Sequence, residues 1–277
     1  MKNIRAALCA AILLILAPAS EASHETFLPN GDIFIPPLAD PKQPRFFLSV
    51  RQYQNHDDFL GAGVGFGENF GMYRYENHEA GGKYALQLNI QAGLFALFEL
   101  NDPTYTLIST DFIVGFPVTY RSGPMSWRLN LYHQSSHMGD EFLLRDNVRR
   151  KSFLYDAVDL LASYEWQSLR GYLGGEYLVH RIPSKFDPGV GHAGIEYYDN
   201  SAAMRSGRFV AGLDLKSFEE HDWEIDASFK AGLEFGKPSP SRRRLRVLLE
   251  GFRGFAHWGQ FYTERVTYYG LGIHLSE

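Results

Sequence analysis

Residues 83–100 read KYALQLNIQAGLFALFEL and carry the clearest pattern in the chain. Apolar residues alternate there with polar or small ones. One face holds Tyr84, Leu86, Leu88, Ile90, Ala92, Leu94, Ala96 and Phe98, and the other holds Lys83, Ala85, Gln87, Asn89, Gln91 and Gly93. A period of two puts successive side chains on opposite faces, so this stretch predicts a β-strand.

The same alternation returns along the chain, most clearly from Trp223 to Gly236. These segments run to ten or more residues, which suits tilted membrane strands of roughly 9–11 residues. Strands of soluble sheets average about 5–6 residues. The apolar faces begin or end in aromatics, as the aromatic girdles of membrane barrels do. The pattern predicts an all-β protein, a transmembrane antiparallel β-barrel whose apolar face meets lipid.

Counting the alternating segments gives about twelve strands, an even number that fits two periplasmic termini. They lie near residues 44–53, 59–75, 83–98, 104–120, 124–137, 151–167, 168–181, 190–198, 207–217, 222–236, 243–256 and 264–275. The last strand departs from the usual barrel ending, because Ser276 and Glu277 stand where a terminal aromatic is common.

The N-terminus has the features of a secretion signal, which we assign to residues 1–22. Lys2 and Arg5 precede an apolar run from Ala6 to Ala17, and small residues follow. The run is shorter than the roughly 20 residues of a membrane helix. Cleavage after Ala22 is the preferred interpretation, with Ala19 as the alternative site and an uncleaved anchor as the alternative reading. Secretion combined with long alternating strands predicts the bacterial outer membrane, reached through the periplasm and the barrel assembly machinery.

Charge and cysteine content narrow the function. Without residues 1–22 the chain has 25 basic residues (27 minus Lys2 and Arg5) and 31 acidic ones (32 minus Glu21), a formal charge of −6. This balance gives no reason to expect nucleic-acid binding. The one cysteine, Cys9, falls in the signal, so packing or the membrane must hold the mature chain.

Charges of both signs interleave on the polar faces of the strands. They are Arg170, Glu176, Asp214, Asp226, Lys230, Glu234, Arg244, Arg246 and Glu250. A selective pore would more naturally carry one sign. We therefore expect an internal salt-bridge network that fills a narrow lumen, with a pore as the alternative.

Residues 23–43, SHETFLPNGDIFIPPLADPKQ, precede the first alternating segment and contain several prolines. Proline opposes strand formation, so we expect an irregular periplasmic segment. If the barrel is not catalytic, this segment is a candidate surface for a periplasmic partner. Residues 44–277 then form the barrel.

One strand breaks the pattern. Residues 124–141 read PMSWRLNLYHQSSHMGDE, in which Trp127 and Leu131 set the lipid-facing register. Carried forward, that register puts His133, Ser135 and His137 on the face that should be apolar. Departures of this kind are where function is expected.

His133 and Ser135 lie on one face, roughly 7 Å apart along the strand. A bend or a rotamer change brings the imidazole to the hydroxyl and makes the serine a nucleophile. Asp156, on the lipid-facing register of the next strand, is the candidate third group that orients His133. Gln134 or backbone amides near Gly139 are candidate oxyanion donors. The alternative is that these polar residues belong to the outer rim above the bilayer.

Acidic residues follow in the next loop. Asp140, Glu141 and Asp146 offer oxygen ligands for calcium. The alternative is a solvated turn paired with Arg145, Arg149 and Arg150. We expect no other cofactor, because a zinc site at His133 and His137 would need further ligands.

The sequence His133-Gln134-Ser135 resembles the catalytic His-Gln-Ser of outer-membrane phospholipase A, a twelve-stranded barrel with its site on the outer wall. Ser136 and His137 replace the Asn-Gly that follows in that family. Barrel lipid A deacylases have a similar His-x-Ser. The resemblance implies hydrolysis of acyl esters in outer-membrane lipids, the expected partners, while the replacement puts the oxyanion-stabilising part in question.

Three longer stretches are similar to a bacterial family catalogued as domain of unknown function 1207. They are PPLADPKQPRF (36–46), YHQSSHMGDEF (132–142) and YDAVDLLASYEW (155–166). This resemblance implies an envelope location and no known activity. Two functions therefore remain open: a lipid hydrolase, or a non-catalytic barrel that is a narrow channel, a structural element or a partner-binding protein.

Overall fold

The computed structural model describes residues 23–54, 58–78, 83–146, 152–200, 207–236 and 244–276. The expected signal, residues 1–22, lies outside this range. Within it, none of the helices has the length and apolar character needed to cross a bilayer.

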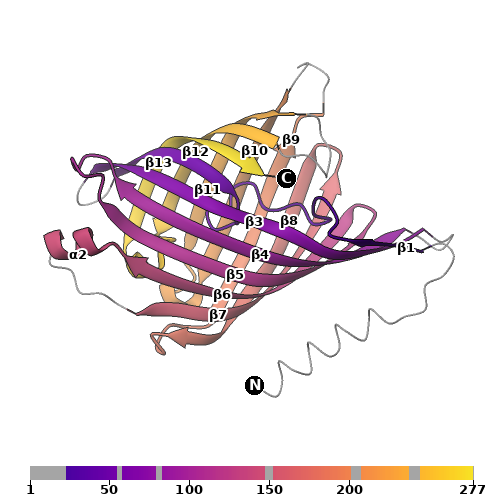
Figure 1. The fold of residues 1–277 in the computed structure, drawn as a ribbon, viewed down its shortest axis with the longest axis horizontal. Helices are drawn as coiled ribbons and strands as arrows, with labels where there is room; N and C mark the ends of the chain where they lie inside the picture. Colours follow the sequence, from indigo (N-terminus) through magenta and orange to yellow (C-terminus); the bar gives the residue numbers. More distant parts are fainter. Residues whose placement is uncertain are drawn as a thin grey trace.

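Twelve antiparallel strands form a closed barrel (Figure 1). They are β2 (Phe46–Gln54), β3 (Phe59–Asn77), β4 (Tyr84–Glu99), β5 (Leu107–Ser122), β6 (Met125–Met138), β7 (Phe153–Trp166), β8 (Leu169–Ile182), β9 (Gly189–Tyr198), β10 (Gly207–Phe218), β11 (Ile225–Phe235), β12 (Arg244–Phe255) and β13 (Arg265–Ser276). Each pairs with its neighbours in sequence, and β13 pairs with β2 to close the ring. The closed ring gives every one of these strands a hydrogen-bonded neighbour on both sides, as a barrel in lipid requires.

The predicted barrel is confirmed strand by strand. All twelve segments appear, and the largest boundary differences are three residues, at the starts of β5 (Leu107) and β11 (Ile225). Only residues 123–124 separate β5 from β6, and only residues 167–168 separate β7 from β8. Both turns lie at the end where β2 begins, and short turns are typical of the periplasmic end of such barrels.

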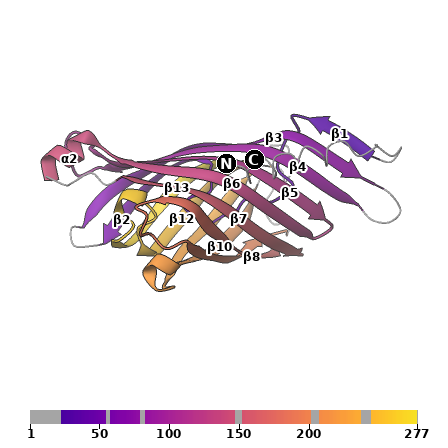
Figure 2. The ribbon, with the colours of Figure 1, turned by 90° about the horizontal axis from the view of Figure 1, so that it is seen from below.

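The opposite end carries the longer connections. Helix α2 (Asp140–Asp146) and the 3-10 turns η1 (Glu219–His221) and η2 (Gly259–Phe261) lie there. Figure 2 shows α2 and β1 (Ser23–Phe27) at opposite ends of the molecule.

The two faces of the strands are as the alternation predicted. Leu129, Leu160 and Leu249 point outward, with 42%, 50% and 63% of their surface exposed. Gln87 and Lys230 point inward and are buried. A wall that is apolar outside and polar inside is the arrangement expected of a barrel in lipid.

Ion pairs fill the lumen, as the interleaved charges predicted. They include Arg51–Glu250 at 2.8 Å, Arg128–Asp159 at 2.9 Å, Arg170–Glu196 at 2.8 Å and Arg246–Glu234 at 2.7 Å. All of these side chains are at least nine-tenths buried. Each of these eight charges has a partner of opposite sign, which a water-poor interior requires.

Residues 31–45, which we call the inner segment, also run inside the lumen (Figure 1). Its Phe34 and Leu38 are fully buried. The Leu38 amide donates to Glu196 at 2.5 Å, and Lys42 pairs with Asp111 of β5. The sequence interpretation named residues 23–43 as a periplasmic segment and a candidate surface for a partner. Their second half packs inside the barrel.

The first residues of the same stretch form a strand, so the expectation of an irregular segment is wrong there. β1 pairs with Tyr73–Asn77 of β3. β3 is longer than β2, and the pairing between the two strands ends at Gly65 of β3. The projecting end of β3 therefore has an unpaired edge, and β1 covers it.

The lipid-facing assignment can be tested at Leu249, at the centre of β12. Leu249→Arg should lower the free energy of unfolding by about 2–4 kcal/mol in lipid, because it places a charge in the apolar band. Urea titration of the refolded protein in vesicles, with Leu249→Phe as the matched control, measures this difference. Equal stability of the two variants would contradict the assignment.

Phe34 tests the packing of the inner segment. Its ring lies between the guanidinium groups of Arg128 and Arg170, 5.2 and 5.0 Å from the ring centroid. Phe34→Ala should destabilise the barrel by about 3–5 kcal/mol, as large core truncations do. Phe27→Ala, on β1 with Phe27 76% exposed, is the control and should change stability by less than about 0.5 kcal/mol. Similar losses for both would mean that the lumen does not depend on the inner segment.

Candidate active site on the outer wall

The candidate site lies on the outer wall where β6 and β7 pair. Their register places His133 directly opposite Asp156, and Ser135 opposite Leu154. His133, His137 and Asp156 are exposed and Ser135 is half-buried, while the residues between them point inward. The predicted outward parity of all four residues is therefore what the structure shows.

His133 and Asp156 are in contact. The imidazole Nδ1 lies 2.8 Å from Asp156 Oδ1, and the two side chains are 46% and 53% exposed. With an ionised carboxylate, Nδ1 carries the proton and donates it, which leaves Nε2 as the basic nitrogen. This is the tautomer that a Ser-His-Asp site requires.

Ser135 lies two residues along the strand from His133, between apolar neighbours. Phe112 of β5 is its partner on one side and Leu154 of β7 on the other. Among the described residues, its hydroxyl has no side-chain hydrogen bond. Ser135 and His133 thus share a face, and no hydrogen bond joins their side chains in the described structure. Catalytic hydrogen bonds of this kind often form only when substrate binds.

Asp156 has a second histidine partner that sequence reasoning missed. His180 Nδ1 of β8 lies 3.4 Å from Asp156 Oδ2. By simple alternation His180 should point inward like Leu178, which is fully buried. A β-bulge makes Val179 an extra residue, so that Asp156 pairs with His180 and Ala157 with Leu178. Bulges re-aim side chains in this way and occur next to active sites.

The two predicted oxyanion donors are not available. Gln134 points into the lumen, where its Oε1 accepts a hydrogen bond from the Tyr155 hydroxyl at 2.9 Å. The Gly139 amide already donates to the Ile108 carbonyl at 3.1 Å. His137 remains, since it is exposed on the same face as Ser135 and packs edge-on against Phe112.

Two of the three acidic residues proposed for calcium can be placed in the described structure. Asp140 and Glu141 occupy the first turn of α2 and are exposed, and the side chain of Asp146 lies outside the described residues. Arg145 pairs instead with Glu99 at 2.7 Å and Asp102 at 2.9 Å. Arg149 and Arg150, the other partners considered for this turn, also lie outside the described range. The calcium site at these three acids therefore stays a prediction.

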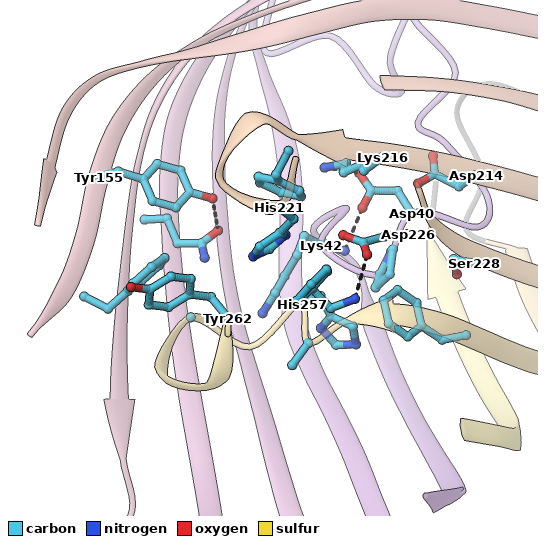
Figure 3. Close-up of a pocket in the computed structure, with 18 of the residues that line it drawn as sticks. Asp40, Lys42, Tyr155, Asp214, Lys216, His221, Asp226, Ser228, His257 and Tyr262 are labelled. Atoms are coloured by element: carbon cyan, nitrogen blue, oxygen red, sulfur yellow. Dashed lines mark hydrogen bonds and ion pairs between the residues drawn. The ribbon is translucent and has the colours of Figure 1, made fainter. Parts of the chain in front are cut away.

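A separate cavity lies inside the barrel, behind this part of the wall (Figure 3). Gln134 and Tyr155 line it from β6 and β7, opposite Lys216 and the loop residue His257. Burial lowers the pKa of His257 well below its usual value, and the nearby charge of Lys42 lowers it further, so this ring is neutral. The volume of about 60 Å³ suits a few water molecules but no lipid.

Comparison with solved structures shows the same kind of barrel. Outer membrane phospholipase A from Escherichia coli has a TM-score of 0.56 and 10% identity, over 84% of this chain and 90% of that chain. The Salmonella typhi outer membrane phospholipase, a dimer with bound calcium, has a TM-score of 0.55 and 10% identity, over 85% and 93%. The KdgM porin has a TM-score of 0.43 and 10% identity, over 83% and 99%.

At these identities, the two phospholipase comparisons show a shared fold. The sequence matches no curated protein. The family described as "Protein of unknown function (DUF1207)" matches residues 4–276, which is nearly the whole chain and includes all three stretches quoted above. The chain belongs to this family of barrels with an outer-membrane fold.

Proposed function

We propose that this protein is an outer-membrane enzyme that hydrolyses acyl esters of membrane lipids. Ser135 is the nucleophile, His133 the general base and Asp156 the acid that orients it. The observation that carries the proposal is the 2.8 Å contact between His133 Nδ1 and Asp156 Oδ1, on an otherwise apolar outer wall beside Ser135. The similarity between the fold of this chain and that of outer membrane phospholipase A supports ester hydrolysis as the reaction class.

The surroundings suit a lipid substrate. Phe112, Val114 and Val179 are 41%, 49% and 60% exposed on the strands beside the site. An acyl chain in the bilayer would already lie against these side chains. Binding then requires only lateral movement of the lipid along the wall until its ester group reaches Ser135. The substrate class that we propose is therefore a phospholipid or the acylated part of lipopolysaccharide.

The reaction that we propose uses the three groups in turn. His133 Nε2 accepts the Ser135 proton as Oγ attacks the ester carbonyl carbon. The tetrahedral intermediate collapses, His133 returns the proton to the leaving alcohol, and the acyl group stays on Ser135. Water, deprotonated by the same nitrogen, then attacks the acyl-enzyme and releases a fatty acid. Asp156 stabilises the imidazolium in both steps.

His137 and His180 have supporting roles in this proposal. His137 is the remaining side-chain donor on the face of Ser135 and would stabilise the oxyanion. His180 holds the second oxygen of Asp156 and so fixes the carboxylate toward His133. We regard His180 as a positioning residue.

Location and partners follow from the same assignment. The short turns mark the periplasmic end, and β6 ends at Met138, five positions after His133, at the other end. The site would therefore face lipids of the outer leaflet. Insertion of such a barrel would depend on the assembly machinery. Calcium belongs in the assay as a separate variable, because the Salmonella typhi phospholipase was solved with bound calcium.

The second candidate is a non-catalytic barrel that binds a periplasmic partner. Phe27 and Leu28, at the end of β1, are 76% and 70% exposed. Most apolar residues of the inner segment are buried in the lumen, so Phe27 and Leu28 are the exposed large apolar side chains within residues 23–43. A narrow channel is less well supported, because the inner segment and the ion pairs fill the lumen among the described residues.

Single substitutions test the nucleophile. Ser135→Ala should lower hydrolysis of labelled phospholipid in vesicles by on the order of 10³-fold or more, with heat-modifiable migration unchanged. His133→Ala should lose about as much, because members of a catalytic unit are not additive. Asp156→Ala should retain roughly ten to a hundred times more activity than Ser135→Ala.

Ser136→Ala is the matched control. Its hydroxyl points inward and donates to Asp111, and the Gln260 contact to its backbone carbonyl is kept in the variant, so the rate of lipid hydrolysis should stay close to that of the wild type. Activity retained in Ser135→Ala would exclude this nucleophile. No hydrolysis of phospholipid or lipopolysaccharide by the wild type, with or without calcium, would favour the non-catalytic barrel.

Cysteine labelling tests the faces independently of activity. In a Cys9→Ser background, Ser135→Cys should react with a membrane-permeant maleimide, because its side chain points outward. Ser136→Cys should react at least about tenfold more slowly, since Ser136 is 3% exposed. Equal rates in the folded protein would mean that the parity of β6 is misassigned.

A further inference from the structure

Three side chains on neighbouring strands converge inside the barrel, apart from the proposed active site. Asp159 of β7, Glu176 of β8 and His192 of β9 each offer one ligand atom, and these atoms lie within 4.8 Å of one another. Register explains the convergence. Asp159 is directly opposite Glu176, and His192 lies opposite Gly174, two residues from Glu176 on the same face.

Two of the converging groups have an atom without a partner. Asp159 Oδ1 and His192 Nδ1 are buried and make no hydrogen bond within the described part of the chain. Both residues are 2% exposed. Leaving a buried polar atom unpaired costs about 1–3 kcal/mol, so two in one cluster call for an explanation.

Asp214 orients the histidine. His192 Nε2 lies 2.7 Å from Asp214 Oδ2, so Nε2 carries the proton and the free lone pair is on Nδ1. A carboxylate that holds the far nitrogen of a histidine is the usual outer partner of a metal-binding imidazole. Nδ1 is thus available to bind a cation.

Cations of the protein already neutralise part of the cluster. Arg128 contacts Asp159 Oδ2 at 2.9 Å, and Lys216 contacts Glu176 Oε1 at 3.2 Å. A salt-bridge network explains these two contacts but leaves Asp159 Oδ1 and His192 Nδ1 unused. Because Lys216 lies next to Glu176, it would compete electrostatically with a bound metal.

We propose that Asp159, Glu176 and His192 bind a divalent transition metal ion that links β7, β8 and β9 from inside the lumen. An imidazole with two carboxylates suits zinc better than calcium or magnesium, which prefer oxygen ligands alone. Asn130 is opposite Asp159, and its buried Oδ1 also has no partner, so it is the candidate fourth ligand. This site is independent of the proposed lipid hydrolysis.

Zinc binding to the full-length, folded protein tests the proposal. The chelator-treated protein should bind one zinc ion in the lumen, measured by elemental analysis after dialysis, and its thermal unfolding midpoint should rise. His192→Gln should lower the zinc affinity at least about tenfold, because it removes the imidazole. The matched control is His274→Gln. His274 also has a carboxylate partner, Glu250 at 2.7 Å, and an unpaired Nδ1, but it belongs to no described cluster of three ligands.

Lys216→Met gives the opposite prediction. Removing the competing ammonium should raise the affinity for zinc, whereas a purely structural cluster would show only a loss of stability. His133→Ala is a control for zinc that binds to the histidines of the outer wall. Such zinc would be lost in this variant, whereas zinc bound in the lumen would be kept. If His192→Gln fails to fold, Asp159→Asn replaces it, with the same expected loss.

Two results would overturn the site. The first is that the wild type binds no zinc. The second is that zinc is retained in His192→Gln, or in Asp159→Asn, but lost in His133→Ala.

Discussion

Closure of the sheet is the constraint on which the rest of this structure depends. Because β13 pairs with β2, each strand has one face toward lipid and one toward a narrow interior. The outer face must be apolar, and the inner face must satisfy its own charges where little water remains. The interleaved acids and bases of β8–β12 meet that demand by pairing between nearby strands, as Arg170 does with Glu196 and Arg246 with Glu234. The chain then needs something to fill the space between them.

The inner segment fills that space and connects it to the wall. Lys42 pairs with Asp111, which also accepts a hydrogen bond from Ser136. The Gln260 side chain donates to the Ser136 carbonyl at 2.7 Å. The inward side of β6 is therefore held by several polar contacts, directly behind Ser135. A strand anchored in this way would hold the proposed catalytic groups in place before substrate binds, as a preorganised site requires.

β7 carries both proposed sites. Asp156 points outward to His133, and Asp159, three residues later, points inward to Glu176 and His192. On a strand without a bulge, an odd spacing puts two side chains on opposite faces. The lipid-facing chemistry and the buried cluster are thus insulated from each other by the wall, although they share a strand. This arrangement makes the two hypotheses separable by single substitutions.

The sequence alone determined the barrel, the number of strands and the direction of most side chains, because alternation with period two is a local property. It also placed His133, Ser135 and Asp156 on one face, since parity needs no knowledge of distance. Tertiary structure decided what local pattern could not. The bulge at Val179 turned His180 to Asp156, against simple alternation. The inner segment lies in the lumen through contacts with Glu196 and Asp111. Local pattern could not predict this position, because both partners are distant in sequence. Asp159, Glu176 and His192 converge only through the register of three strands. Strand pairing and closure of the barrel set that register, and the three residues themselves do not reveal it.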